Sequence, residues 1–221
     1  MIASLANATV EKPVDATFLI LDANFGRNNR NKAAWNGTGD NLTLGGGKNG
    51  ENDAESYHST FSIYQKFTAS KGVYKFTAQG FYRQDGSDNN LPKFYINDEE
   101  TVFPLRTGTE NSMIDACTSF KNGNYAIAPM FVELDNDGEI TVSAKLENNT
   151  TLWCIWDKFE LTYYGPEATL TEVKFGDLVK QVNELRAKAT KLKDNKNIGA
   201  GTVAKLQRKL ITLLLLHLMQ R

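Results

Sequence analysis

Hydrophobic residues in the first three quarters of the chain alternate with polar residues in short runs, which clusters of Gly, Asn and Asp separate. Alternation with period two over about four to eight residues predicts half-buried β-strands. We expect such strands at residues 16–22, 59–67, 72–83, 93–97, 100–105, 125–134, 139–146 and 151–165. Because these runs show no helical pattern, the predicted class is all-β, an antiparallel sandwich.

Residues 151–165, "TLWCIWDKFELTYYG", form the most aromatic of the strand candidates. The run is apolar at odd and even positions early and mainly at odd positions later, which predicts a strand that crosses the sheet interior and leaves toward its edge. We therefore expect Trp153 and Trp156 to be core residues and not an exposed aromatic platform. Gly165 and Pro166 end strand geometry and predict a domain boundary.

Two segments between the strand candidates have other patterns. Residues 111–123 fit a short helix or an irregular crossing better than a strand. The segment "LDNDGEI" resembles the first half of an EF-hand calcium loop, but the bidentate glutamate that completes such a loop is missing at the required spacing. We interpret its Asp-Gly pair as a hairpin turn between two strands.

The hydrophobic period changes after Pro166. The apolar positions then follow one helical stripe: Leu170, Val173, Leu178, Val179, Val182, Leu185 and Ala189. After the break "KDNKNIGAGT" a second helix is expected, and its run "LITLLLLHL" is apolar on every face. The sequence thus predicts an N-terminal extension at 1–14, a sandwich at 15–166 and a C-terminal α-helical hairpin at 167–221.

The net charge of −1 gives no reason to expect nucleic acid or an anionic membrane as the main partner. Charge is uneven, because residues from Glu167 onward hold eleven Lys and Arg against five Asp and Glu. The apolar run is much shorter than the ~20 residues of a membrane helix. Such a run must pack on the first helix, on the sandwich or on something outside the chain, so a homodimer or a neighbouring module is expected, with folding back on the sheet as the alternative.

Sequence motifs for catalysis are sparse. Two cysteines, Cys117 and Cys154, are too few for a framework of several disulfides, although a single bridge between them remains an alternative. His217 lies in the leucine-rich tail, so a histidine-dependent nucleophilic site would have to use His58. A pair of carboxylates brought together by folding leaves no signature in a single sequence, so a glycoside hydrolase remains an alternative.

Several segments, taken in order, resemble a known family: "DATFLILDANFGRNNRNKAAWNG", "AESYHSTFSIYQKF", "KGVYKFTAQGFYRQDG", "MIDACTSFKNGNY" and "WCIWDKFELTYYG". Together they are similar to the galactose-binding-like jelly-roll modules of polysaccharide-degrading gut bacteria. The resemblance covers about residues 15–165. Ala23, Ser62 and Lys158 depart from the family pattern, which affects the transfer of single residues more than the fold.

The resemblance implies a two-sheet jelly roll whose loops at one end bind sugars. In such a site an aromatic ring covers the apolar face of a sugar while polar side chains bond its hydroxyl groups. The candidates are Trp35, Tyr82 with Arg83, and Asp115. Their alternatives are structural, since Trp35 can fill the sandwich end, Tyr82 can be core and Arg83 can pair with a buried carboxylate.

The resemblance also implies an exported protein, found at the cell surface, in the periplasm or secreted, and one structural calcium ion. Glu160, with Asp22 or Asp40, would supply its oxygen ligands. The opening residues lack the pattern of a signal peptide, so a leader is expected to be absent from this sequence. Three functions remain: a non-catalytic glycan-binding module, a structural or adhesive spacer, and an enzyme with a carboxylate pair.

Overall fold

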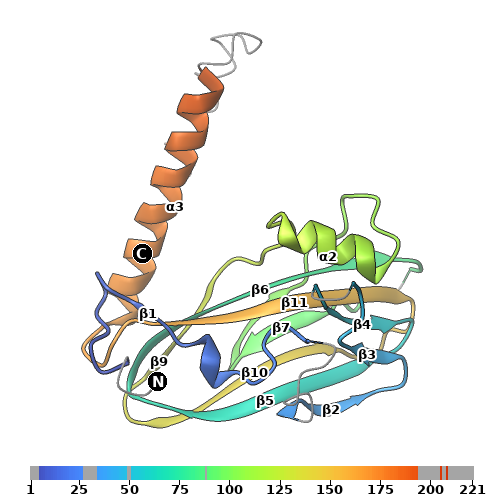
Figure 1. The fold of residues 1–221 in the computed structure, drawn as a ribbon, viewed down its shortest axis with the longest axis horizontal. Coiled ribbons are helices and arrows are strands. Elements are labelled where there is room, and N and C mark those ends of the chain that lie inside the picture. The colour runs from blue at the N-terminus through green and yellow to red at the C-terminus, as the bar shows by residue number, and fades with distance from the viewer. Residues whose placement is uncertain are drawn as a thin grey trace. The chain divides into compact units, whose positions relative to one another are not determined.

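The computed structural model describes residues 5–26, 34–48, 51–87 and 89–193, with the single positions 205 and 208. The chain divides into two compact units, Met1–Leu170 and Thr171–Arg221, and each is described by itself. In the first unit, two antiparallel sheets form two layers of a jelly-roll sandwich (Figure 1). The predicted fold class is therefore confirmed.

The first sheet has the strand order β3-β4-β11-β6-β9, and the short strand β1 also pairs with β11. Its strands are β1 (Val14–Asp15), β3 (Leu42–Leu44), β4 (Ala54–Tyr57), β6 (Gly72–Gln84), β9 (Met130–Leu134) and β11 (Leu152–Tyr163). The second sheet has the order β2-β5-β10-β7-β8. Its strands are β2 (Asn36–Gly39), β5 (Phe61–Ala69), β7 (Lys93–Ile96), β8 (Glu99–Val102) and β10 (Gly138–Leu146).

Strands β6 and β11 form the centre of the first sheet, and their side chains alternate between its two faces. The inner face meets the second sheet and is aromatic. Trp156 is fully buried there, stacked on Phe61 with ring centroids 4.7 Å apart and in edge contact with Phe25 and Phe103. Packing between the two sheets therefore explains why the alternate positions Leu152, Cys154 and Trp156 of β11 are apolar.

The outer face of the first sheet is covered in part by helix α2 (Met113–Lys121), which lies over β6 and β11 in Figure 1. Phe81, Trp153 and Ile155 point outward and pack against Ala116 and Phe120 of the helix. The helix begins after Ser112, whose side chain accepts a hydrogen bond from the Asp115 N–H and caps the first turn. The predictions of a short helix here and of core positions for Trp153 and Trp156 are confirmed.

The predicted strand at residues 16–22 is wrong. Residues Thr17–Leu19 form a 3-10 helix, η1, and a turn follows. Hydrogen bonds from the backbone to nearby side chains explain this difference, because they compete with the pairing of a strand. Asp15 Oδ1 accepts from the Thr17 N–H, and Asp22 Oδ1 accepts from the Gly26 N–H. Asp22 and Phe25 also have positive φ angles, which lie outside the β region.

The Asp-Gly pair at residues 137–138 does not form the predicted hairpin. Strand β9 belongs to the first sheet and β10 to the second, so the segment between them carries the chain from one layer to the other. The predicted N-terminal extension is described from Leu5 onward. Its Leu5 and Ala8 are buried in the core that lies between the sheets.

In the second unit, the described structure is helix α3 (Leu170–Lys193). Among the described residues, none of the helices has the length and apolarity to cross a membrane. The run "LITLLLLHL" and the second helix of the predicted hairpin lie outside the described residues. The hairpin, the domain boundaries and the homodimer therefore stay predictions.

Candidate functional site

Trp35 lies inside the end of the sandwich. Only 7% of its surface is exposed, its ring stacks on Phe25 with a centroid distance of 4.9 Å, and Nε1–H donates to the Asp22 carbonyl at 3.2 Å. This position matches the structural alternative, in which Trp35 fills the end of the core. Its proposed contact with sugar stays a prediction, although little of the ring faces solvent. Residues 27–33, beside it in sequence, lie outside the described part of the chain.

Tyr82 and Arg83 point to opposite sides of the first sheet, as consecutive strand residues must. Tyr82 is 7% exposed and belongs to the core between the sheets. Arg83 lies on the outer face, with its guanidinium carbon 4.9 Å from the centre of the Trp153 ring. The two residues therefore do not present one shared surface, and Arg83 alone is placed near polar neighbours.

Arg83 is the centre of a group of side chains that we call the loop-end cluster: Tyr57, His58, Arg83, Asp85 and Asn111. The Nε and Nη2 groups of Arg83 each donate to an oxygen of Asp85 at 2.7 Å, and Nη1 donates to Asn111 Oδ1 at 2.7 Å. His58 Nε2 lies 2.9 Å from Asp85 Oδ2. The cluster joins the ends of β4 and β6 to the segment before α2.

Asp115 acts on this cluster through the backbone. Its Oδ2 accepts from the Asn111 N–H at 3.0 Å, and this bond is the first cause of its lowered pKa. The side chain of Arg83 likewise lowers the pKa of Asp85, against the effect of burial, and His58 adds to the lowering. Two of the predicted site residues, Arg83 and Asp115, are thus brought into one hydrogen-bonded network through Asn111.

Tyr57 gives the loop-end cluster an accessible ring. Its side chain is 45% exposed and stacks on His58 with centroids 4.1 Å apart. His58 has a φ of 48°, which turns the chain out of β4 toward β5. Neither Tyr57 nor Asp85 is among the site residues expected from the sequence. The segment "AESYH" was a usable signal for Tyr57, because it places an aromatic residue immediately before a turn.

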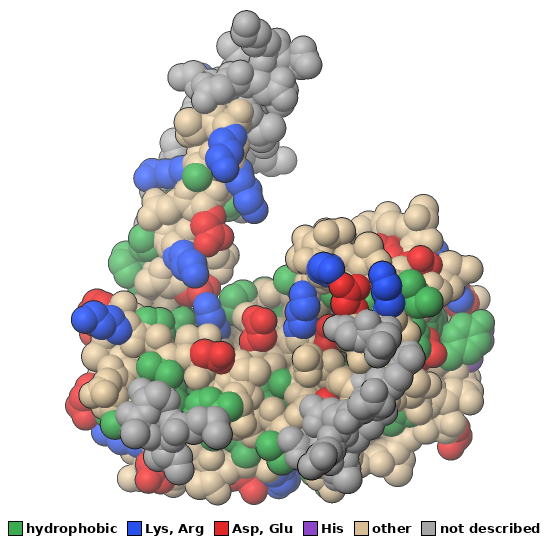
Figure 2. Space-filling view, viewed as in Figure 1, with side chains coloured by type: hydrophobic (Ala, Val, Ile, Leu, Met, Phe, Trp, Pro, Cys, Tyr) green, Lys and Arg blue, Asp and Glu red, His purple; other side chains and the backbone are tan. Residues whose placement is uncertain are grey.

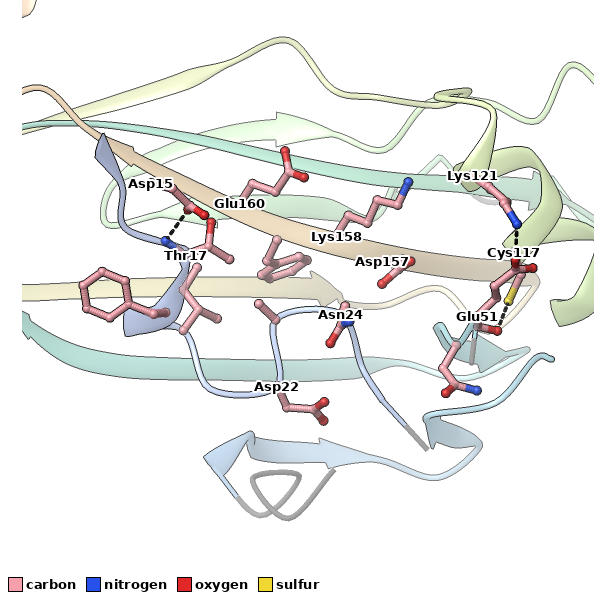
Figure 3. Close-up of a pocket in the computed structure, with 15 residues that line it drawn as sticks. Asp15, Thr17, Asp22, Asn24, Glu51, Cys117, Lys121, Asp157, Lys158 and Glu160 are labelled. Atoms are coloured by element: carbon pink, nitrogen blue, oxygen red, sulfur yellow. Dashed lines mark hydrogen bonds and ion pairs between the residues drawn. The ribbon is translucent and has the colours of Figure 1, made fainter. Parts of the chain in front are cut away.

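A pocket of about 650 Å³ lies elsewhere, along the edge of β11 between the parts paired with β1 and β4. We call it the edge pocket. Its lining, shown in Figure 3, comprises Asp15, Thr17, Phe18, Ile20, Asp22, Ala23, Asn24, Glu51, Asn52, Cys117, Lys121, Asp157, Lys158, Phe159 and Glu160. Its volume falls in the usual range for small-molecule sites, about 300–1,000 Å³.

A β-bulge in β11 determines the directions in which side chains point into the edge pocket. The pairing with β6 shifts register between Asp157 and Glu160, and Lys158 has a φ of 53°. The extra residue changes the direction of neighbouring side chains. In Figure 3, Asp157 and Lys158 leave the β11 ribbon on opposite sides. Backbone bonds from Phe159 N–H to Ala23 O and from Ala16 N–H to Leu161 O hold the opposite wall in place.

Asp157 is a buried acid of the lining. It is 7% exposed, and its Oδ1 has no hydrogen-bond partner among the described residues. Burial raises its pKa to about 7; Glu160 and Asp22 add to the rise, and Lys158 opposes it. Near neutral pH this carboxyl group therefore takes up or releases a proton readily.

A second buried acid, Asp53, lies next to the edge pocket. Burial raises its pKa to about 8, and its Oδ2 accepts from Cys117 Sγ at 3.3 Å. Burial also raises the pKa of the Cys117 thiol to about 12. Cys117 and Cys154 are both free and buried, so the disulfide that the sequence left open does not form in this structure.

The predicted calcium ligands are only partly brought together. Asp22 and Glu160 line the edge pocket, but Asp40 lines a separate groove near Lys145 and Glu147. Within the described ranges, no group of three or more His, Cys, Asp or Glu residues is arranged to hold a metal ion. Asp40 is thus not placed beside Glu160, and the calcium site with Glu160 and Asp22 stays a prediction.

The outer face of the second sheet holds another exposed aromatic position. Tyr64 of β5 and Tyr95 of β7 lie on either side of Ser143 in β10, in one row across the strands. Tyr64 is 37% exposed. Two strand spacings, roughly 10 Å, separate the two tyrosine positions. This row lies in the other sheet from the loop-end cluster and is a suitable comparison for it.

No family model and no curated protein matches this sequence. Solved structures with similar folds are carbohydrate-binding modules. TmCBM61 in complex with β-1,4-galactotriose has 13% identity and a TM-score of 0.40, with 66% of this chain and 97% of that chain covered. The CBM22-1 xylan-binding domain from Paenibacillus barcinonensis Xyn10C has 10% identity and a TM-score of 0.35, with 65% and 92% covered. These similarities are too weak to carry an argument about function.

Proposed function

We propose that this chain is a non-catalytic carbohydrate-binding module that binds a glycan at the loop-end cluster. The observation that carries this proposal is the half-exposed ring of Tyr57 beside the bonded group of Arg83, Asp85 and Asn111. The family resemblance of the sequence supports it, since it implies sugar binding by loops at one end of the sandwich. The same resemblance supports an exported protein of a polysaccharide-utilisation system.

The chemistry of the cluster suits a sugar. The exposed face of Tyr57 offers an apolar surface to the C–H groups of a pyranose, while the Asp85 carboxylate and the Asn111 amide offer hydrogen bonds to hydroxyl groups. Arg83 holds both of these groups through charge-assisted or direct hydrogen bonds, so they are oriented before the ligand arrives. Such preorganisation reduces the entropy that is lost on binding.

The proposal is tested with the full chain on a glycan array, followed by calorimetry with the best ligand. We expect Tyr57→Ala to weaken binding at least tenfold, about 1.4 kcal/mol, with an unchanged melting temperature because the ring is exposed. Asp85→Ala should weaken binding as well. Tyr64→Ala removes a comparably exposed tyrosine from the other sheet and should change affinity less than twofold.

Three outcomes contradict the proposal. If no glycan binds, the chain is better described as a structural or adhesive spacer. If Tyr64→Ala abolishes binding and Tyr57→Ala does not, the glycan lies on the outer face of the second sheet. If reducing ends accumulate when the ligand is incubated with the chain, the protein is a glycoside hydrolase and not a non-catalytic module.

A further inference from the structure

The edge pocket has a surplus of acidic side chains. Among the described residues of its lining there are five carboxylates, those of Asp15, Asp22, Glu51, Asp157 and Glu160, and two ammonium groups, those of Lys121 and Lys158. Figure 2 shows acidic and basic side chains next to one another on the surface beside α2. The composition of the lining therefore favours a ligand that brings positive charge and hydrogen-bond donors.

Both lysines already have partners. Lys121 forms an ion pair with Glu51, and Lys158 Nζ donates to the Phe120 carbonyl at 2.7 Å. Neither of these two bonds involves Asp157. The Asp157 Oδ1 atom is deeply buried and lacks a hydrogen-bond partner among the described residues. A buried carboxylate oxygen without a donor is costly, and native structures normally satisfy such atoms.

We propose that the edge pocket binds an amino sugar, whose protonated amine donates to Asp157 and whose hydroxyl groups meet the remaining polar wall. In Figure 3, Asp157 lies on the side of the β11 ribbon that faces Asn24 and Asp22. The Asn24 side chain offers an amide for hydrogen bonds, and Phe18 is a partly buried ring that offers apolar surface. The pocket volume fits one or two sugar rings.

The size and donor geometry favour an organic ammonium over a metal ion. A pocket of about 650 Å³ is far larger than one cation needs. The described acids form no group arranged to hold a metal. A pKa raised to about 7 by burial and by neighbouring carboxylates fits an acid that awaits a positive partner, because that partner would favour the charged form.

The edge pocket and the loop-end cluster have no residue in common. The inference therefore does not depend on the proposed function, and separate variants distinguish their failures. Asp157→Asn tests the edge pocket, and Tyr57→Ala tests the loop-end cluster. Asp157→Asn keeps the shape of the side chain and removes a buried charge, so the variant is expected to fold.

The experiment titrates the full chain at pH 7.5 with three probes: a β-1,4-linked glucosamine tetramer, the fully N-acetylated tetramer and calcium chloride alone. We expect the free-amine tetramer to bind at least tenfold more tightly than the acetylated one. Asp157→Asn should weaken binding of the free-amine tetramer at least tenfold. Glu133→Gln, which removes an exposed carboxylate from β9 of the same sheet, should change it less than twofold.

Equal binding of the two tetramers, or unchanged binding in Asp157→Asn, would overturn the inference. Saturable calcium binding that is lost in Asp157→Asn would also overturn it and identify the pocket as a metal site. If Tyr57→Ala abolishes binding of the amine tetramer and Asp157→Asn does not, the amine is recognised at the loop-end cluster.

Discussion

At the scale of single residues, the buried acids determine how stability depends on pH. Asp53 is fully buried with a pKa of about 8, whereas an unfolded Asp has a pKa near 3.9. Between these values the folded state holds the proton and the unfolded state does not. By linkage, the free energy of unfolding therefore falls as pH rises from about 4 to about 8.

Asp53→Asn removes this titration. We compare the free energy of unfolding of the variant with that of the parent at each pH. The difference, variant minus parent, should increase by on the order of 3 kcal/mol from pH 5 to pH 9, because only the parent must ionise a buried group. Urea unfolding of both proteins across this range measures the difference, and the exposed control Glu133→Gln should show none. A difference that stays constant with pH would contradict the assignment.

Trp156 is fully buried and packs between the two sheets. Trp156→Ala is expected to cost about 3–5 kcal/mol, because the cavity would open among Phe25, Phe61 and Phe103. Its Nε1 has no hydrogen-bond partner among the described residues, so Trp156→Phe should cost much less. Denaturant titration measures both losses. If Trp156→Ala lowers the free energy of unfolding by less than about 1 kcal/mol, the ring does not contribute to core packing as described.

At the scale of elements, side-chain parity determines what each strand contributes. Tyr82 and Arg83 are neighbours in β6, but their side chains lie on opposite faces of the sheet. Tyr82 points into the core and Arg83 lies on the outer face. The bulge in β11 changes this alternation near Asp157 and thereby forms the edge pocket. Helix α2 covers one part of the outer face, so Trp153 is buried even though it points away from the sandwich core.

At the scale of the whole molecule, the two units are expected to separate. The first unit ends at Leu170, four residues beyond the Pro166 boundary expected from the sequence. Phe175, Val179 and Leu185 of α3 are exposed apolar residues spaced along one helix, which is typical of a helix that associates with a partner. The homodimer, or a neighbouring module in its place, stays a prediction.

A chain shortened after Leu170 should be a soluble monomer that unfolds cooperatively, whereas the full chain should show concentration-dependent association. Light scattering after size-exclusion chromatography measures both masses. Phe175→Glu with Val179→Glu should reduce association of the full chain without changing the stability of the sandwich. Aggregation of the shortened chain would show that residues after Leu170 complete its core.

The sequence by itself determined the all-β class, the main strands β5, β6, β10 and β11 and the core positions of both tryptophans. Each of these four strands has nine or more residues with a clear pattern of apolar positions, so the local pattern agrees with the observed burial. It did not reveal β2, β3 and β4, because β2 contains no large apolar residue and β3 and β4 lie in a segment rich in Gly, Asn and Asp. It also predicted a strand where Asp15 and Asp22 bond the nearby backbone.

Only the tertiary structure decided which polar groups meet. Tyr57, Asp85 and Asn111 come from three separate segments, and pairing of β4, β6 and β11 brings them to Arg83. Asp22 and Asp157 are 135 positions apart in the sequence and share one pocket because the loop after β1 runs along the edge of β11. Their burial and mutual repulsion, which raise the pKa of Asp157, exist only after this approach, since a carboxylate in an extended chain is surrounded by water.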